Sequence, residues 1–316
     1  MGIIPVNKIS VSTAYNAKNK SQFSEIVSEF KSIGFNAVEL NVEIKDIWAD
    51  EIKNYVKNKE LIVLGLHNFC PMINSVPIDR TYLNAYLLSS DDEQERELAV
   101  KYTMRTIDFA RELDASYVVI HSGEVPTEPK GSELYSYARK FGIKNSEFEK
   151  YKMECISDRK KKSDKYFNNL LKSLDRLSVY ANNNSGKKIL LGIENRMYLN
   201  EIPDIEEIGK IIERFKGAPL GYWHDTGHAE INFRMDYIDD PNIYLELYSD
   251  RTVGIHLHDV RGLVDHYAPG SGEIDFTKLK KFINSEMFLT LEVHDKSDKS
   301  ELIDGSDYIK TILGFN

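Results

Sequence analysis

The chain has 316 residues, of which 41% are hydrophobic and 29% charged, and its formal net charge at pH 7 is −9. This balance is typical of a globular protein that buries a core without disulfide support, and its two cysteines, Cys70 and Cys155, fit neither a disulfide framework nor a zinc ribbon. The acidic total argues against a nucleic-acid surface, which normally carries a basic stripe.

Short apolar runs alternate with amphipathic stretches from one end of the chain to the other. Strands are predicted over residues 8–13, 36–41, 61–67, 116–121, 188–194, 220–225, 252–258 and 288–294. Helices are predicted over residues 21–33, 44–58, 91–113, 164–182, 205–215, a short stretch near 243, 276–283 and 308–313. Strands that alternate with helices predict a parallel sheet. Eight such units favour an α/β fold of one domain over residues 1–316, a (β/α)8 TIM barrel.

One segment, residues 123–162, breaks this rhythm after the fourth strand and is too long for a simple connection. Its aromatic residues stand among many charges: Tyr135, Tyr137, Phe141, Phe148 and Tyr151. We expect a partly helical insertion at the C-terminal end of the barrel. It is either a lid over the site or a contact between copies of the chain or a passive addition.

All histidines of the chain fall at the C-terminal end of a predicted strand or in the loop that follows it. None falls in a predicted helix. They are His67, His121, His224, His228, His256, His258, His266 and His294. In (β/α)8 enzymes the chemistry takes place at that end of the barrel, so the placement predicts the functional site there.

Three acids share this position, since Glu194, Asp225 and Glu292 end the fifth, sixth and eighth predicted strands. A carboxylate buried without a partner is costly, and a bound cation would offset the cost. Neighbouring barrel strands bring their ends together, so three carboxylates and an imidazole can surround one ion. Mixed oxygen and nitrogen ligands suit Mn²⁺ or Zn²⁺, with Co²⁺ and Mg²⁺ as alternatives.

Strand alternation sorts the histidines near these acids. His256 and His258 share the inward face of the seventh strand, and we favour His256 as the metal ligand and His258 as a substrate contact. Asp225 faces inward, so His224 faces the helices and is predicted to be structural. His294 shares the face of Glu292 but lies beyond it, and both roles stay open for it.

Five motifs arrive in order along the chain. They are GIENR at 192–196, HDTGH at 224–228, HLHD at 256–259, DHYAPGSG at 265–272 and LE at 291–292. With these motifs the chain resembles the xylose-isomerase-like barrel superfamily, which contains sugar isomerases and epimerases and the endonuclease IV type of apurinic endonucleases. The resemblance covers nearly the whole chain, and residues 123–162 are the least covered.

The epimerase branch implies a divalent-metal-dependent isomerase or epimerase of a small sugar, sugar phosphate or polyol. In it Glu194, Asp225, His256 and Glu292 hold one metal, and Glu194 and Glu292 remove and return a proton through a metal-bound enediolate. Six further residues are expected to contact substrate: His67, His121, Arg196, His228, His258 and His266. Arg196 favours a phosphorylated or acidic sugar, unless it pairs with Glu39 or another acid at the barrel mouth.

Two alternatives stay open. A zinc-dependent phosphodiesterase of the apurinic-endonuclease type would hold three zinc ions and recruit His67, His121, His228 and His266. That branch places an Asp two residues before the loop histidine, where Val264 stands here, and it has small residues in place of Arg196. The other alternative is a divergent barrel that binds a small ligand without catalysis.

The same observations bear on location and partners. No apolar run is long enough to span a membrane, and the first residues show no signal peptide. We therefore expect a cytoplasmic protein with reduced thiols, no membrane contact and a carbohydrate partner. The resemblance also implies a homodimer, because proteins of this superfamily often dimerise.

Overall fold

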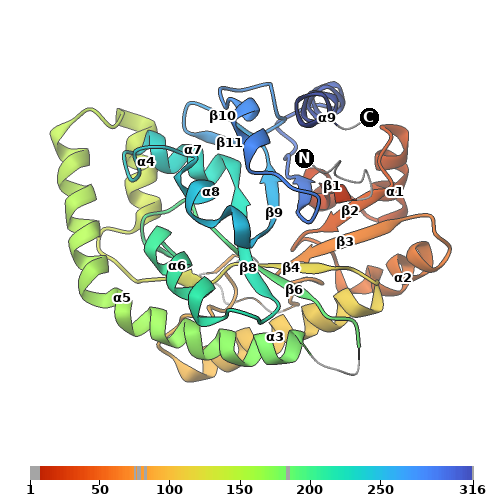
Figure 1. The fold of residues 1–316 in the computed structure, drawn as a ribbon, viewed down its shortest axis with the longest axis horizontal. Coiled ribbons are helices and arrows are strands. Elements are labelled where there is room, and N and C mark those ends of the chain that lie inside the picture. Colours follow the sequence, from red (N-terminus) through yellow and green to blue (C-terminus); the bar gives the residue numbers. More distant parts are fainter. Residues whose placement is uncertain (1–7, 75, 77–79, 82–83, 183–185, 315–316) are drawn as a thin grey trace.

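The structure, a computed structural model, describes residues 8–74, 76, 80, 81, 84–182 and 186–314. Parallel strands close into a barrel in the order β1-β12-β9-β8-β6-β4-β3-β2 (Figure 1). Their bounds are β1 Ile9–Ser12, β2 Ala37–Leu40, β3 Ile62–His67, β4 Tyr117–Ile120, β6 Leu190–Glu194, β8 Leu220–Asp225, β9 Thr252–Leu257 and β12 Phe288–Leu291. The predicted (β/α)8 fold is confirmed.

Helices cover the outside of the barrel. They are α1 Phe23–Ser32, α2 Ala49–Lys57, α3 Glu93–Glu112, α4 Gly131–Phe141, α5 Ser146–Ala181, α6 Ile205–Arg214, α7 Thr226–Arg234, α8 Ile243–Tyr248 and α9 Lys299–Leu313. Shorter 3-10 turns are η2 Thr13–Tyr15, η3 Ala17–Asn19, η4 Asp46–Trp48, η5 Ser249–Arg251 and η6 Phe276–Lys281. Periodic apolar residues explain their orientation: α1, for example, buries Phe23, Ile26 and Phe30 on one stripe.

The elements differ from the predicted ones in several places. The helix expected over 164–182 begins at Ser146, so half of the insertion is the first part of one 36-residue helix, α5. The helix expected from 276 is the 3-10 turn η6. The expectation that no histidine lies in a helix was wrong, because Asp225 caps α7 by accepting from the His228 N–H, and His228 falls in its first turn.

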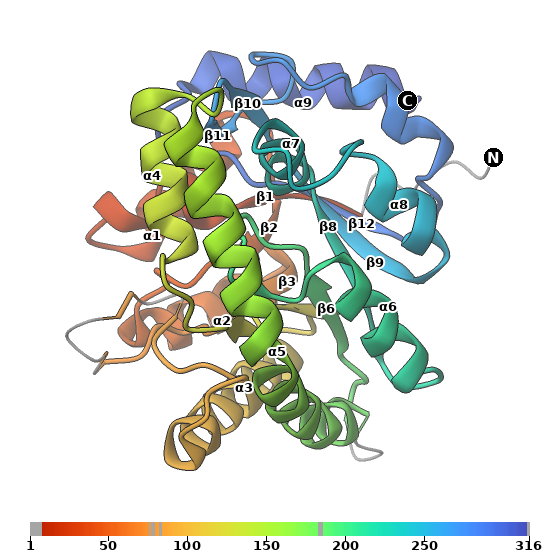
Figure 2. The ribbon, with the colours of Figure 1, turned by 90° about the vertical axis from the view of Figure 1, so that its left-hand side faces the viewer.

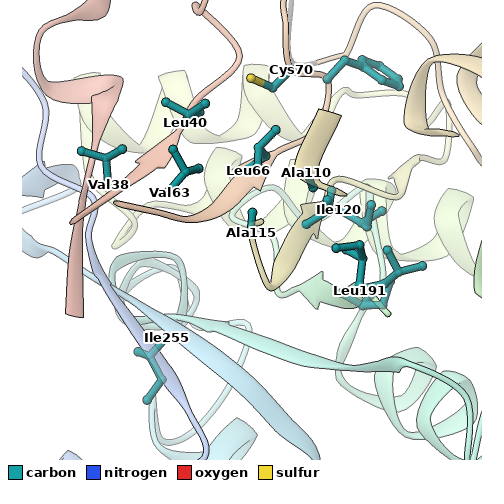
Figure 3. Close-up of a cluster of buried hydrophobic side chains, with 14 of the residues drawn as sticks. Val38, Leu40, Val63, Leu66, Cys70, Ala110, Ala115, Ile120, Leu191 and Ile255 are labelled. Carbon is teal, nitrogen blue, oxygen red and sulfur yellow. The ribbon is translucent and has the colours of Figure 1, made fainter. Parts of the chain in front are cut away.

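Two layers of side chains fill the fold. The main core lies between strands and helices, where Val38, Leu66 and Ile255 point outward (Figure 3). A smaller cluster fills the barrel interior around Tyr117 and Trp223. The register between β2 and β3 shifts after Val38, and a Cβ on Gly65 would lie 2.0 Å from the Tyr117 ring. Glycine at 65 is therefore what lets Tyr117 cross the barrel centre.

Two short pairs of strands lie at the C-terminal end of the barrel. β5 (Gly123–Glu124) pairs with β7 (Glu201–Ile202), and β10 (Asp259–Arg261) pairs with β11 (Val264–Tyr267). The helices α4 and α5 lie side by side (Figure 2). They pack through Leu134 and Phe148 against Ile231 of α7 and Val260 of β10.

Buried ion pairs fix the insertion to the barrel. Arg159 of α5 is 8% exposed and lies 2.7 Å from both Asp204 and Glu207 at the start of α6. Within the described residues, no helix combines the length and apolarity needed to cross a membrane.

Candidate metal centre

Four ionisable side chains meet where strands β6, β8, β9 and β12 end. Glu194 and Asp225 close β6 and β8, His256 lies within β9, and Glu292 directly follows β12. All four are buried, and one ligand atom from each lies within 4.8 Å of the others. The sequence-predicted tetrad is thus one spatial cluster, which we call the tetrad below.

His256 is oriented by a carboxylate on its far side. Its Nε2 lies 3.0 Å from Glu39 Oε1, and Glu39 in turn accepts from the Tyr117 hydroxyl at 2.9 Å. A carboxylate accepts only, so Nε2 donates to Glu39, and Nδ1 faces the tetrad. Metal-binding histidines are commonly held in this way by a carboxylate on the second nitrogen.

The space at Nδ1 suits a cation. Nδ1 lies 2.9 Å from Glu194, 3.0 Å from Glu292 and 3.7 Å from Asp225. Ligand atoms about 2.1 Å from one ion and at right angles to each other are about 3.0 Å apart. Burial alone would lower the pKa of His256, yet Glu292 and Glu39 hold it well above its usual range. The cluster therefore demands positive charge at this point, and its oxygen and nitrogen donors fit a divalent metal.

The carboxylates show the complementary shift. Burial would raise the pKa of Asp225, but His228 and His258 hold it well below its usual range. Burial would also raise the pKa of Glu292, but His256 holds it well below its usual range. These carboxylates are thus ionised, as metal ligands must be.

His258 has a different position from His256. Its Nδ1 accepts from the backbone N–H of His266 at 3.0 Å, and its Nε2 donates to Asp225 at 2.9 Å. Both nitrogens are committed, and the side chain is fully buried. A Cβ on residue 227 would lie 2.1 Å from this ring, so Gly227 makes the approach possible. His258 orients Asp225 and is not among the residues that line the cavity described below. With His266 and Glu292 it forms a further group of donor atoms within 4.8 Å of one another.

A second donor group shares Glu194 with the tetrad. His67, His121 and Glu194 each offer an atom within 4.8 Å of the others. The Arg196 guanidinium enters this group: Nη1 bonds to Glu194 Oε2 and lies 2.6 Å from His121 Nε2. Its Nε donates to Glu201 at 3.1 Å. Arg196 pairs with Glu194 and Glu201, and not with Glu39.

The histidines of this second group are neutral. Burial lowers the pKa of both His67 and His121 to about 4, and at His121 the Arg196 guanidinium adds to the effect. Among the described residues, His121 Nδ1 has no hydrogen-bond partner. Unprotonated ring nitrogens are therefore present in this group, but the Arg196 guanidinium already contacts one nitrogen, His121 Nε2.

A third donor group lies at the loop after β9. His228, Asp265 and His266 form it, and His266 Nδ1 lies 3.1 Å from Asp265. His266 has a left-handed φ of 58°, which breaks strand alternation. The acid that the sequence places one residue late, Asp265, therefore still reaches this group. Burial would lower the pKa of His266, but Asp265 and Glu292 raise it to about 10.

Members of the tetrad, of the group around His121 and of the group around His228 line one cavity of about 250 Å³. Its lining includes most predicted contacts, His67, His121, Arg196, His228 and His266, together with Glu194 and Glu292. The rest of the lining is Ala14, Tyr15, Lys18, Asn19, Asn41, Val42, Glu43, His294 and Asp295. Of the described residues that line it, none belongs to 123–162, the predicted lid segment.

Three residues that shape the site were not predicted to be site members. Glu39 was considered only as a partner for Arg196, although an acid within an apolar strand was a usable signal. Asn195 accepts from the Asp225 N–H at 2.7 Å and donates to the Asp225 carbonyl. Asp259 accepts from the N–H groups of Val260, Gly270, Gly272, Glu273 and Ile274, which shapes the loop after β11.

Comparisons with known structures agree with this architecture. A D-tagatose 3-epimerase-like protein is 19% identical, with 97% of each chain covered and a TM-score of 0.65. The 3-keto-D-glucoside 4-epimerase from E. coli is 15% identical over 96% of this chain and 99% of its own (TM-score 0.65). A D-psicose 3-epimerase from Clostridium cellulolyticum, solved with D-tagatose, is 11% identical over 97% and 99% (TM-score 0.65).

At these identities the likeness shows a shared fold. A search of curated proteins found no match. The family model described as xylose isomerase-like TIM barrel matches residues 27–312, which include the tetrad and the other donor groups. The chain therefore belongs to the xylose isomerase-like TIM barrel family.

Proposed function

We propose that the protein is a divalent-metal-dependent isomerase or epimerase of a small sugar. One observation carries the proposal: three ionised carboxylates and the Nδ1 of a carboxylate-held histidine converge at the floor of a cavity of about 250 Å³. The structural neighbours named as sugar epimerases support the choice of substrate class.

The residues have distinct tasks in this reaction. When bound, the cation would act as a Lewis acid on substrate oxygens. Glu194 and Glu292 both line the cavity and face each other across the tetrad. One carboxylate removes the proton from a substrate carbon and the other returns it on the opposite face. Glu39 and His258 hold His256 and Asp225 in place, so the two bases face substrate with little reorganisation.

Arg196 favours one ion over several. Its Nη1 contacts both Glu194 Oε2 and His121 Nε2, which lie 2.8 Å from each other and are the atoms that a second ion would need. Because Glu194 and Glu201 already balance its charge, Arg196 offers an acidic substrate less attraction than a free guanidinium would. We therefore favour a neutral sugar or polyol over a sugar phosphate.

Solvent isotope exchange tests the proposal. Purified protein is incubated in D₂O with a panel of ketopentoses and ketohexoses, with and without added Mn²⁺. We expect deuterium at one substrate carbon, loss of exchange with a chelator, and recovery with Mn²⁺. Elemental analysis should give about one metal ion per chain.

The group of His228, Asp265 and His266 favours a second candidate, a zinc-dependent phosphodiesterase of the apurinic-endonuclease type. Nicking of a duplex with one abasic site, abolished by a chelator, would establish it. Two to three zinc ions per chain and no isotope exchange with any sugar would replace the first proposal by this one.

A further inference from the structure

His294 is the cavity histidine to which the sequence assigns no role. It follows Glu292 by two residues, after β12 has ended, and its side chain lines the cavity of about 250 Å³ at the tetrad. Two residues of chain span at most about 7 Å. Exposure increases from the buried Glu292 through the partly buried His294 to the exposed Asp295. The His294 ring therefore lies between the tetrad and the mouth of the cavity.

Stacked rings fix the position of His294. Its ring lies nearly parallel to that of His266, with centroids 3.8 Å apart and planes inclined by 15°. His266 stacks in the same way on His258, at 4.0 Å and 6°, and His258 bonds to Asp225. The backbone N–H of His294 also donates to the His266 carbonyl at 3.1 Å. These contacts hold the ring in a set position relative to the tetrad.

Both nitrogens of the His294 ring are free to bind a ligand. Neither has a hydrogen-bond partner among the residues that the structure describes, and neither is sealed from solvent. The other histidines of the lining each contact a protein group through a ring nitrogen. They are His67, His121, His228 and His266. Substrate can therefore bind His294 without displacing a protein contact.

Such a ring is suited to a hydroxyl group. Imidazole carries at least one N–H in every protonation state, and a hydroxyl oxygen accepts from it. Polar groups in a closed site are normally paired, and bound substrate would supply the partner that the described chain lacks here. A sugar with its reacting carbon at the tetrad extends its remaining carbons, and their hydroxyl groups, along the wall towards His294.

The charges of the more exposed part of the lining favour an uncharged group. This part carries two carboxylates, Glu43 and Asp295, against one lysine, Lys18. A phosphate or carboxylate at the far end of the sugar would approach both acids, and juxtaposed like charges are costly. A hydroxyl group has no charge to repel.

We propose that His294 binds a hydroxyl group on the part of the substrate that does not react, and that it thereby selects uncharged sugars with a hydroxyl at that place. The inference rests on the proposed function, because it takes the reacting carbon to lie between Glu194 and Glu292. His294 is then a specificity-determining residue: it contributes to substrate binding, whereas the tetrad performs the proton transfer.

Two variants separate the nitrogens of the ring from its stacking. His294→Phe keeps an aromatic ring beside His266 but removes both nitrogens, whereas His294→Gln keeps a hydrogen-bond donor. Isotope exchange is followed with protein loaded with Mn²⁺ and the ketohexose that exchanges best. We expect His294→Phe to raise KM about threefold to tenfold at nearly unchanged kcat, which corresponds to one neutral hydrogen bond. His294→Gln should recover part of the loss.

The 5-deoxy and 6-deoxy analogues of the same ketohexose identify the hydroxyl group. For the analogue that lacks the bound hydroxyl, the parent protein and His294→Phe should have the same KM. A purely structural role of the ring would raise KM for all of these sugars by one common factor. The 6-phosphate of the ketohexose should be exchanged less well than the ketohexose by the parent protein.

The outcomes distinguish this assignment from the proposed function. The assignment is wrong if His294→Phe changes KM equally for all sugars or for none, or if the parent protein prefers the 6-phosphate. Exchange by the parent protein would retain the proposed function in each of these cases. Absence of exchange with every sugar would overturn the proposed function, and the assignment of His294 with it.

Discussion

The tetrad and the group of His67, His121 and Glu194 have similar donors and share one glutamate, but they differ in how their charge is balanced. In the tetrad, three carboxylates and His256 Nδ1 face a common point without a basic side chain of Lys or Arg between them. In the other group, Arg196 is a built-in cation. Because Arg196 already balances the charge of the second group, we expect a metal ion in the tetrad rather than there.

The largest effect should come from Glu292→Gln, which removes a base from the tetrad. We expect turnover to fall by roughly 10²- to 10⁴-fold, because proton transfer by a positioned carboxylate contributes about that much. Deuterium exchange with the best sugar measures it. Glu286→Gln, at an 89% exposed side chain, is the control. Full activity in Glu292→Gln would exclude the two-base mechanism.

Glu39→Gln tests whether the carboxylate behind His256 prepares the tetrad. Loss of the negative charge of Glu39 beside His256 Nε2 should weaken metal binding by roughly 10- to 100-fold. A competition titration with a chromogenic chelator gives the affinity. Tyr117→Phe removes only the hydroxyl that donates to Glu39, so its effect should be smaller. Equal affinity in Glu39→Gln and the parent protein would assign Glu39 a purely structural role.

Arg196→Met would make the two groups alike. Removal of the guanidinium frees Glu194 Oε2 and His121 Nε2, so we expect the zinc content after saturation and desalting to rise from about one to about two ions per chain. Arg196→Lys retains the charge and should hold one. A second zinc already present in the parent protein would contradict the assigned role of Arg196.

The smallest effect is expected far from both groups. Tyr135→Phe removes the hydrogen bond from the insertion to the Leu263 carbonyl. The free energy of unfolding should fall by about 1 kcal/mol, measured by urea denaturation. Metal content and isotope exchange should stay unchanged, and a change in either would link the insertion to the tetrad.

Local patterns predicted most of the fold. Apolar runs and amphipathic stretches determine where strands and helices form, and parallel strands place Glu194, Asp225, His256 and Glu292 at one end. The boundary of α5 was missed because the charged stretch 146–163 has little apolar periodicity, whereas buried pairs such as Arg159 with Glu207 stabilise it.

What the sequence could not predict depends on contacts between distant strands. Glu39 and His256 are 217 positions apart, and their pairing follows only from barrel closure. The choice between His256 and His258 needed the hydrogen bond from the His266 N–H. Placement of Asp265 depended on a left-handed residue, His266, at a position where glycine would ordinarily be expected.

The unbroken course of α5 has a mechanical consequence. At about 1.5 Å per residue its 36 residues form a rod about 54 Å long. Its C-terminal half packs on the barrel, and its N-terminal half packs against α4. The ion pairs of Arg159 with Asp204 and Glu207 hold the helix to the barrel between these two halves. A lid that opens and closes would need a hinge near Lys162, and the helix continues unbroken through that point. The insertion is therefore expected to support the barrel mouth rigidly, through its packing against α7.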